Sequence, residues 1–167
     1  MMKEAREFCN LFNNPPQWSN ERCKMPLPGS DRHHVYHLCE CTDPDNIAAT
    51  LEAAKIHSIA LIGISPAAWS VGLALKHRQF KVTLIASGSE TAYVKNRLQA
   101  GDVGAFFQHH GIILHPNAAK SLQGSQIHCQ SGYCGFVCEG RFIKESEEVG
   151  CVITESGNVY ADAVMII

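Results

Sequence analysis

The residues of this sequence best placed to do chemistry lie in one turn, between the apolar run 58–62 and a segment that begins at Pro66. Gly63, Ser65 and Ala68 occupy the three positions that a G-x-G-x-x-G turn gives to glycine. In such a turn the first glycine permits the tight bend, the second lets the backbone approach a pyrophosphate, and the third lets the helix pack near the strand. A helix that starts there offers N–H groups and a partial positive charge to phosphates. The spacing therefore predicts a dinucleotide site.

Several residues of the turn depart from that pattern. The Cβ and hydroxyl of Ser65 occupy space that a pyrophosphate would use, and Pro66 removes one N–H donor from the start of the helix. An acid that binds the ribose hydroxyls should fall near residue 86, where the sequence has alanine. The nearest acid, Glu90, comes after the expected end of the strand. A structural crossover that binds no ligand therefore remains an alternative.

The periodicity of apolar residues predicts the elements that would hold this turn. Residues 58–62 and 81–86 are apolar, β-branched runs, which are typical of strands covered on both faces. The segment between them, 66–78, predicts a helix with Ser65 as its N-cap and Pro66 in its first turn. This order predicts two parallel strands joined by a right-handed crossover. A stripe of mostly small residues would let the helix lie close to the sheet: Ala68, Val71, Gly72 and Leu75.

Beyond residue 86 the pattern predicts the rest of an α/β domain. A helical region at 92–110, broken near Gly101, should lead to a third strand at 112–114, and the run 163–167 should form the last buried strand. We therefore expect a Rossmann-like parallel sheet with crossover helices, and a three-stranded antiparallel β-meander before its last strand. The short strands of the second half are expected at 118–122, 127–129, 135–138, 151–154 and 159–160, with a hairpin turn at Ser156-Gly157 and a solvated loop at 144–148.

The amino-terminal third has a different character. Residues 1–24 are polar and irregular, which predicts a tail or an incomplete element. The prolines of residues 25–29 exclude a helix and predict a connector. A short strand at 35–38 and a helix that starts after the N-cap Thr42 should follow. The expected organisation has three parts, at 1–24, 25–57 and 58–167.

The composition excludes several classes of protein. With 14 Lys+Arg against 16 Asp+Glu, the net charge of -2 provides no basic patch, so a nucleic-acid partner is not expected. No apolar run has the length of a membrane span. The amino terminus has neither an apolar signal core nor a targeting pattern, so a cytoplasmic and a mitochondrial location both stay open. The 8 cysteines are then expected to be reduced thiols.

Two groups of cysteine and histidine raise the question of a metal. Cys134 and Cys138 have a zinc-like spacing, with Cys129 and His128 nearby, but no matching second pair stands out. Thiols on a β-meander are the simpler interpretation, and a zinc module is kept as an alternative. The second group is His37, Cys39 and Cys41. No metal ligand and no catalytic residue is predicted.

Taken together, residues 25–167 resemble the NADH-binding domain of FAD-dependent pyridine nucleotide–disulfide oxidoreductases. The likeness is greatest to the branch of apoptosis-inducing factor, and in particular its mitochondrion-associated third member. It rests on order and spacing more than on identity, and the segments that carry it are Leu27–Gly29, Val35–Leu38, Asp43–Ile47, Leu61–Val71, Lys81–Ile85, Val103-Gly104, His110–Ile112, Pro116–Ala118 and Ala161–Val164. They are similar to the family's I-P-G connector, N-V-x-x-L strand, E-D-A-x-x-I helix start, V-I-G-G-G-x-I-G-x-E turn, K-V-T-V-V strand, V-G and H-G-V segments, and closing A-D-x-V strand.

The resemblance implies that residues 58–167 bind NAD(P)H and that residues 25–57 come from the edge of an FAD-binding domain. FAD itself would be held only by the complete parent enzyme, because this chain has no flavin-binding G-x-G-x-x-G and no redox cysteine pair. The family's glutamate after the third glycine is Ser70 here, and its ribose acid is Ala86. The cofactor-binding residues that the resemblance implies are Gly63, Ile64, Ser65, Pro66, Ala67, Ala86 and Ser87.

The sequence therefore predicts the NAD(P)H-binding fragment of an FAD-dependent NAD(P)H oxidoreductase that resembles apoptosis-inducing factor. Its expected partners are the nucleotide and the FAD-binding domain of the parent. The alternative is a diverged, non-catalytic Rossmann-like module that acts only through protein interaction.

Overall fold

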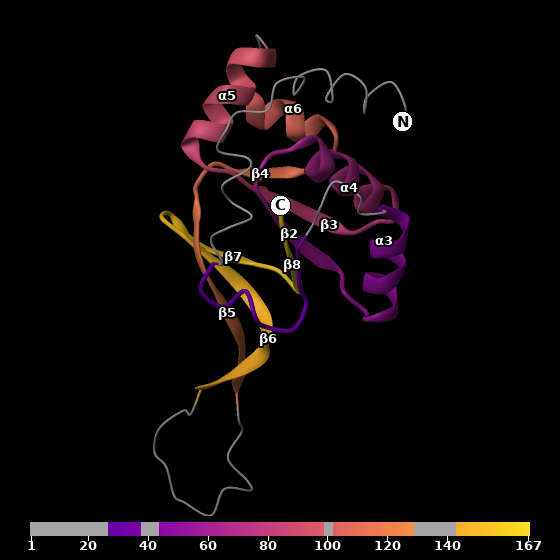
Figure 1. Ribbon diagram of the computed structural model, residues 1–167, viewed down its shortest axis with the longest axis vertical. Helices are drawn as coiled ribbons and strands as arrows, with labels where there is room; N and C mark the ends of the chain where they lie inside the picture. Colours follow the sequence, from indigo (N-terminus) through magenta and orange to yellow (C-terminus); the bar gives the residue numbers. More distant parts are fainter. Residues whose placement is uncertain (1–26, 38–43, 99–101, 129–142) are drawn as a thin grey trace, which may run out of the picture.

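The computed structural model describes residues 27–37, 44–98, 102–128 and 143–167, and these form the expected α/β fold (Figure 1). A five-stranded parallel sheet has the order β1-β8-β2-β3-β4, and a separate antiparallel sheet has the order β5-β6-β7. The elements are β1 (Val35–His37), α3 (Pro44–Ala53), β2 (Ser58–Ile62), α4 (Pro66–His77), β3 (Lys81–Ile85), α5 (Gly88–Leu98), α6 (Val103–His109), β4 (Ile113–His115), β5 (Ala119–His128), β6 (Ile143–Thr154), β7 (Gly157–Tyr160) and β8 (Ala163–Ile166). None of the described helices is both long and apolar enough to cross a membrane.

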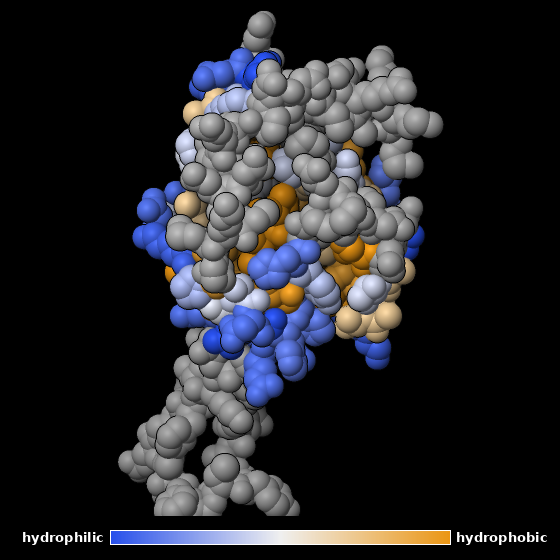
Figure 2. Space-filling model, viewed as in Figure 1, coloured by the Kyte–Doolittle hydropathy of each residue, from blue (hydrophilic) through white to orange (hydrophobic). Residues whose placement is uncertain are grey.

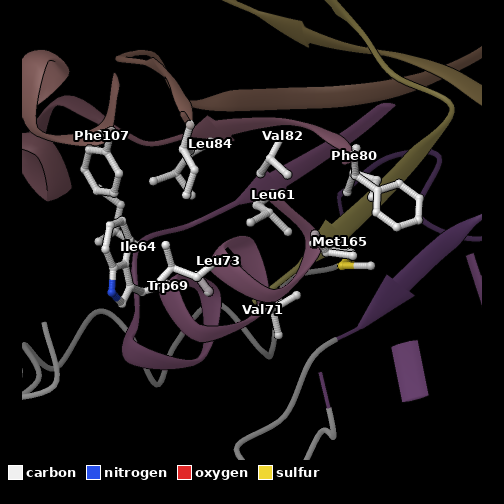
Figure 3. Close-up of a cluster of buried hydrophobic side chains, with 14 of the residues drawn as sticks. Leu61, Ile64, Trp69, Val71, Leu73, Phe80, Val82, Leu84, Phe107 and Met165 are labelled. Carbon is white, nitrogen blue, oxygen red and sulfur yellow. The ribbon is translucent and has the colours of Figure 1, made fainter. Parts of the chain in front are cut away.

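The central strand β2 separates two hydrophobic cores. Ile59 and Leu61 pack on one face against helices α3, α4 and α6, a cluster shown in part in Figure 3. Ala60 and Ile62 pack on the other face, against residues of the antiparallel sheet that include Val152. Because side chains alternate along a strand, a strand buried on both faces must be apolar at every position. The domain therefore has three layers: helices, parallel sheet and antiparallel sheet.

Helix α4 lies close to the sheet because Gly72 has no side chain. A Cβ added at this position would be 3.2 Å from Cδ1 of Leu61 and 3.3 Å from Cδ1 of Ile112. The stripe expected from the sequence thus faces the sheet, with Ala68 and Leu75 buried along the same helix. On the face shown in Figure 2, the coloured surface has both hydrophobic and hydrophilic areas.

The amino-terminal segment is part of the same sheet. Strand β1 pairs in parallel with β8, which adds a strand to the four expected. Helix α3 packs against α4. Upstream of β1, the Pro28 carbonyl accepts a hydrogen bond of 2.8 Å from the Leu122 N–H of β5, and the backbone of His33 bridges to Glu148 of β6. The segment therefore holds the two sheets together, while its origin in an FAD-binding domain stays a prediction.

The strands of the second sheet are longer than expected. The sequence predicts two separate strands at 118–122 and 127–129. The structure instead has one continuous strand, β5, which includes most of both ranges and the residues between them. The expected loop at 144–148 is part of β6, where Lys144 pairs with Ile127 and Glu145 with Gln126. Backbone pairing in a hairpin ribbon does not require apolar side chains, so the polar composition of this segment was misleading. The strand expected at 135–138 lies outside the described residues.

Three helices lead into the parallel sheet through the same type of connection. Each ends in a residue with left-handed backbone, followed by a buried apolar residue whose N–H bonds to a carbonyl five residues back, which is a Schellman motif. The left-handed residues are Lys55 (φ 58), Gln79 (φ 69) and Gly111 (φ 73), and the apolar ones are Ile56, Phe80 and Ile112. Only one of the three left-handed positions carries the glycine that favours this conformation.

Replacement of Gln79 by glycine should therefore stabilise the protein. Glycine adopts a positive φ without the steric cost of a Cβ, so the free energy of unfolding should rise by about 1 kcal/mol. Urea denaturation measures the change. The matched control is Gln108→Gly inside helix α6, which should lower the same quantity by about 1 kcal/mol because glycine is unfavourable within a helix. A loss of stability for Gln79→Gly would contradict this explanation of the connection.

Asp162, in the loop before β8, ties that loop to the start of β2. Its Oδ2 accepts hydrogen bonds from the N–H of His57 at 3.1 Å, the N–H of Ser58 at 2.8 Å and the hydroxyl of Ser58 at 2.9 Å. Partial burial raises the pKa of the Asp162 carboxyl. The hydrogen bonds from Ser58 and His57, together with the charge of His57, lower the pKa by more than burial raises it, so it lies below its ordinary value. The ionised form is therefore the one that stabilises the fold.

The contribution of Asp162 should depend on pH. A carboxyl whose pKa is lower in the folded state stabilises it fully above the unfolded value of 3.8, and this contribution disappears as the pH falls through the lower folded value. Asp162→Asn should reduce the free energy of unfolding by about 1 kcal/mol at pH 7 and much less near pH 2. Denaturation at the two pH values measures the difference, and an equal loss at both would argue against this role.

Candidate functional site

The candidate site is the turn between β2 and α4, at the carboxyl edge of the parallel sheet. Ligands of open α/β sheets bind at this edge. Gly63 has a φ of 106°, a conformation that a side chain would strain, and its N–H donates to the Ile85 carbonyl of β3 at 2.9 Å. The first glycine of the pattern therefore has the role that the sequence predicted. It ends the strand and turns the chain toward the helix.

Ser65 is the N-cap of α4, as expected. Its backbone is extended (φ -149°, ψ 166°), and its Oγ accepts a hydrogen bond of 3.0 Å from the N–H of Ala68. Pro66 is the first residue of the helix, where its missing donor costs little. The cap stabilises α4, but it also uses an N–H group that a bound phosphate could otherwise accept from.

The second side of the site begins at Ser87, two residues after the end of β3. The N–H of Ser87 donates to Oε2 of Glu90 at 2.6 Å, and the N–H of Glu90 donates to Oγ of Ser87 at 3.3 Å. This reciprocal pair is a capping box, which starts helix α5 at Gly88. The expected start at residue 92 was four residues late, although the pattern S-x-x-E was present in the sequence.

Glu90 connects the two sides. Its Oε1 accepts a hydrogen bond of 3.1 Å from the N–H of Ile64, the residue between Gly63 and Ser65. Its Oε2 accepts from the hydroxyl of Ser87 at 2.7 Å as well as from its N–H. The side chain is only 1% exposed. An acid does therefore reach the turn, but from the first turn of α5 instead of the end of β3. In the sequence, Glu90 lies past the end of β3, and no local pattern indicates its contact with Ile64.

The structure gathers the predicted residues at one edge. Gly63, Ile64 and Ser65 form the turn, and Pro66 and Ala67 are the first two residues of α4. Ala86 and Ser87 reach the same edge from β3. Ala86 is buried, and its N–H donates to the His115 carbonyl at 3.1 Å, which continues the pairing of β3 with β4.

Aromatic residues close the space behind the turn. Trp69 stacks on Phe106 with 5.5 Å between ring centroids and meets Phe107 edge-on at 5.5 Å and His110 at 4.9 Å. The cavity next to them, lined by Ile64 and Trp69 among others, measures about 10 Å³, which is room for a single water. Figure 3 shows Trp69 and Phe107 beside Ile64. Trp69 is therefore a packing residue, and a ligand would have to bind on the outer side of the turn.

Several backbone donors of the turn are already used within the protein. Three N–H groups of the segment already donate to acceptors of the protein: that of Gly63 to the Ile85 carbonyl, that of Ile64 to Glu90, and that of Ala68 to Ser65. Pro66 has no N–H, and a carboxylate lies at the place where negative phosphates would approach. These three donors of the turn are therefore satisfied within the protein.

No group of three possible metal ligands occurs among the described residues. Cys39, Cys41, Cys129, Cys134 and Cys138 all lie outside them, so the zinc alternative is untested there. Cys151 of β6 is buried.

No family model and no curated protein sequence matches the chain. The structure is similar to an FAD-dependent pyridine nucleotide-disulphide oxidoreductase from Desulfovibrio vulgaris, with a TM-score of 0.56 and 14% identity over 84% of this chain and 31% of that one. An NAD-dependent persulfide reductase from A. fulgidus has a TM-score of 0.56 and 14% identity, over 86% of this chain and 23% of the reductase. Putidaredoxin reductase, in its covalent complex with putidaredoxin, has a TM-score of 0.53 and 20% identity, over 85% of this chain and 31% of the matched chain. The chain thus spans less than a third of each, and the likeness shows a shared fold.

The importance of the Ser65 cap can be measured directly. Ser65→Ala should lower the free energy of unfolding by about 1 kcal/mol, because the N–H of Ala68 loses its acceptor. Ser65→Gly should cost only a few tenths, roughly 0.3 kcal/mol, since glycine is tolerated at this position. Urea denaturation of the two variants gives both values, and equal costs would show that the hydroxyl does not stabilise the helix.

Proposed function

We propose that this chain is the NAD(P)H-binding domain of an FAD-dependent NAD(P)H oxidoreductase related to apoptosis-inducing factor. The observation that carries the proposal is the turn at Gly63, where a strand buried on both faces passes into a helix at the carboxyl edge of a parallel sheet. The solved structures that share the fold support it, because they are described as FAD-dependent, NAD-dependent or NADH-utilising enzymes.

In this proposal the chain binds and orients the nucleotide. The backbone of residues 63–67 lies along the pyrophosphate, and Ala86 and Ser87 lie beside the adenosine ribose. NAD(P)H supplies a hydride to a flavin that is held by the FAD-binding domain of the parent enzyme. We propose that residues 25–57, which include β1 and α3, come from the edge of that domain.

Affinity for the nucleotide is expected to be low in the isolated chain. The N–H groups of Ile64 and Ala68 already have acceptors, and each would have to exchange one for a phosphate oxygen. Neither an acid nor an arginine follows Ala86 directly to select between NADH and NADPH through the ribose. A dissociation constant in the millimolar range, corresponding to about -4 kcal/mol, fits such a site.

The hydrogen bonds that the turn makes within the protein favour a second candidate, a non-catalytic module that keeps the fold and acts through protein contacts. The N–H groups of Ile64 and Ala68 have acceptors within the protein, so neither needs a ligand to be satisfied. The two candidates differ in one measurable property, since only the first binds a nucleotide.

Titration of the purified chain with NADH, followed by nucleotide fluorescence, tests the proposal. We expect saturable binding with a Kd on the order of 1 mM, and about tenfold tighter binding for Ser65→Gly, which removes the Cβ and hydroxyl from the pyrophosphate position. Ser121→Gly, on β5 of the antiparallel sheet, is the control and should behave as the wild type. If neither the wild type nor Ser65→Gly binds at several millimolar NADH, the non-catalytic module is the correct interpretation.

A further inference from the structure

We propose that Glu90 is an internal competitor of the nucleotide: its carboxylate occupies the anion position of the turn, and a pyrophosphate binds only when this carboxylate leaves Ile64. The inference rests on the proposed function and adds the residue that limits affinity. It follows from what the side chain contacts, how deeply it is buried and what a phosphate would need.

The contact itself is that of an anion bound to a turn. Oε1 of Glu90 accepts the hydrogen bond of the Ile64 N–H at 3.1 Å, within the three residues that join strand to helix. Such N–H groups are the donors that hold phosphates at the start of a helix. A carboxylate oxygen and a phosphate oxygen carry the same sign of charge and accept the same type of hydrogen bond. Both cannot use this N–H at once.

Burial makes the competition effective. Glu90 is 1% exposed, and its Oε2 accepts two further hydrogen bonds, both from Ser87. A buried carboxylate is stable only when its oxygens are satisfied, and here they are. Water screens a buried charge less than an exposed one, so repulsion toward an entering phosphate is stronger than at the surface. The carboxylate therefore opposes the nucleotide both by occupying the donor and by its charge.

The competition is coupled to the start of helix α5. The Oε2 atom that completes the capping box belongs to the same carboxylate whose Oε1 holds Ile64. A rotation of the side chain that frees the turn would also remove the acceptor of the Ser87 N–H. Nucleotide binding should thus loosen the first turn of α5, which adds to the cost of opening the site.

Two variants test the proposal: Glu90→Ala removes the carboxylate, and Glu90→Gln removes the charge while it keeps an acceptor and the side-chain volume. NADH affinity is measured by fluorescence, and adenosine, which has no phosphate, is titrated by calorimetry. Glu52→Gln, at the end of α3, is the charge-matched control. Circular dichroism and thermal melting select a temperature at which all variants are folded. Because Glu90→Ala loses a cap, Glu90→Gln keeps the test decisive if the alanine variant does not fold.

Glu90→Ala should bind NADH at least about tenfold more tightly than the wild type, with a smaller gain for Glu90→Gln and none for Glu52→Gln. Adenosine affinity should not change, because the gain depends on phosphate; a purely structural effect would alter both ligands alike. Unchanged or weaker NADH binding in both Glu90 variants, beside a wild type that binds, overturns the inference alone. No binding by any variant overturns it together with the proposed function. If the Glu90 variants bind NADH and the wild type does not, the result supports the inference and shows that the native turn is closed to NADH.

Discussion

The structure depends on one constraint: strand β2 is buried on both faces and must pass into helix α4 within three residues. Burial on both faces requires the continuous apolar run at 58–62 and places the helices on one side and the antiparallel sheet on the other. The short passage requires the left-handed backbone of Gly63, which brings the amino end of α4 to the carboxyl edge of the sheet. Both cores and the candidate site follow from this single connection.

The same connection creates backbone donors that something must satisfy. Nucleotide-binding turns leave these groups to a phosphate, whereas here protein side chains take two of them. The hydroxyl of Ser65 accepts from Ala68, and the carboxylate of Glu90 accepts from Ile64. Each contact stabilises the isolated fold and each opposes an incoming anion. The stability of the fold and the proposed affinity for a nucleotide thus depend on the same two hydrogen bonds.

The differences between sequence and structure arise where pairing, not local pattern, decides the outcome. Strand β1 was recognised as a strand, but nothing in residues 35–38 specifies β8 as its neighbour. Polar residues 144–148 lie in strand β6, where Lys144 and Glu145 pair with β5 and Glu148 is bridged to His33, and such backbone pairing leaves no apolar period in the sequence. The first turn of α5 lies outside the helix predicted at 92–110, although Ser87 and Glu90 have the spacing of a capping box.

The sequence by itself determined the order of elements from β2 to β4, the place of the turn and the cap at Ser65. These features arise from contacts between residues near in the chain, which leave a periodic or local signature. Only the tertiary structure decided that Glu90 reaches Ile64, that Asp162 ties β8 to β2 and that residues 27–37 join the two sheets. The partners in these contacts lie far apart in the sequence, and only the packing of parallel strands brings them together.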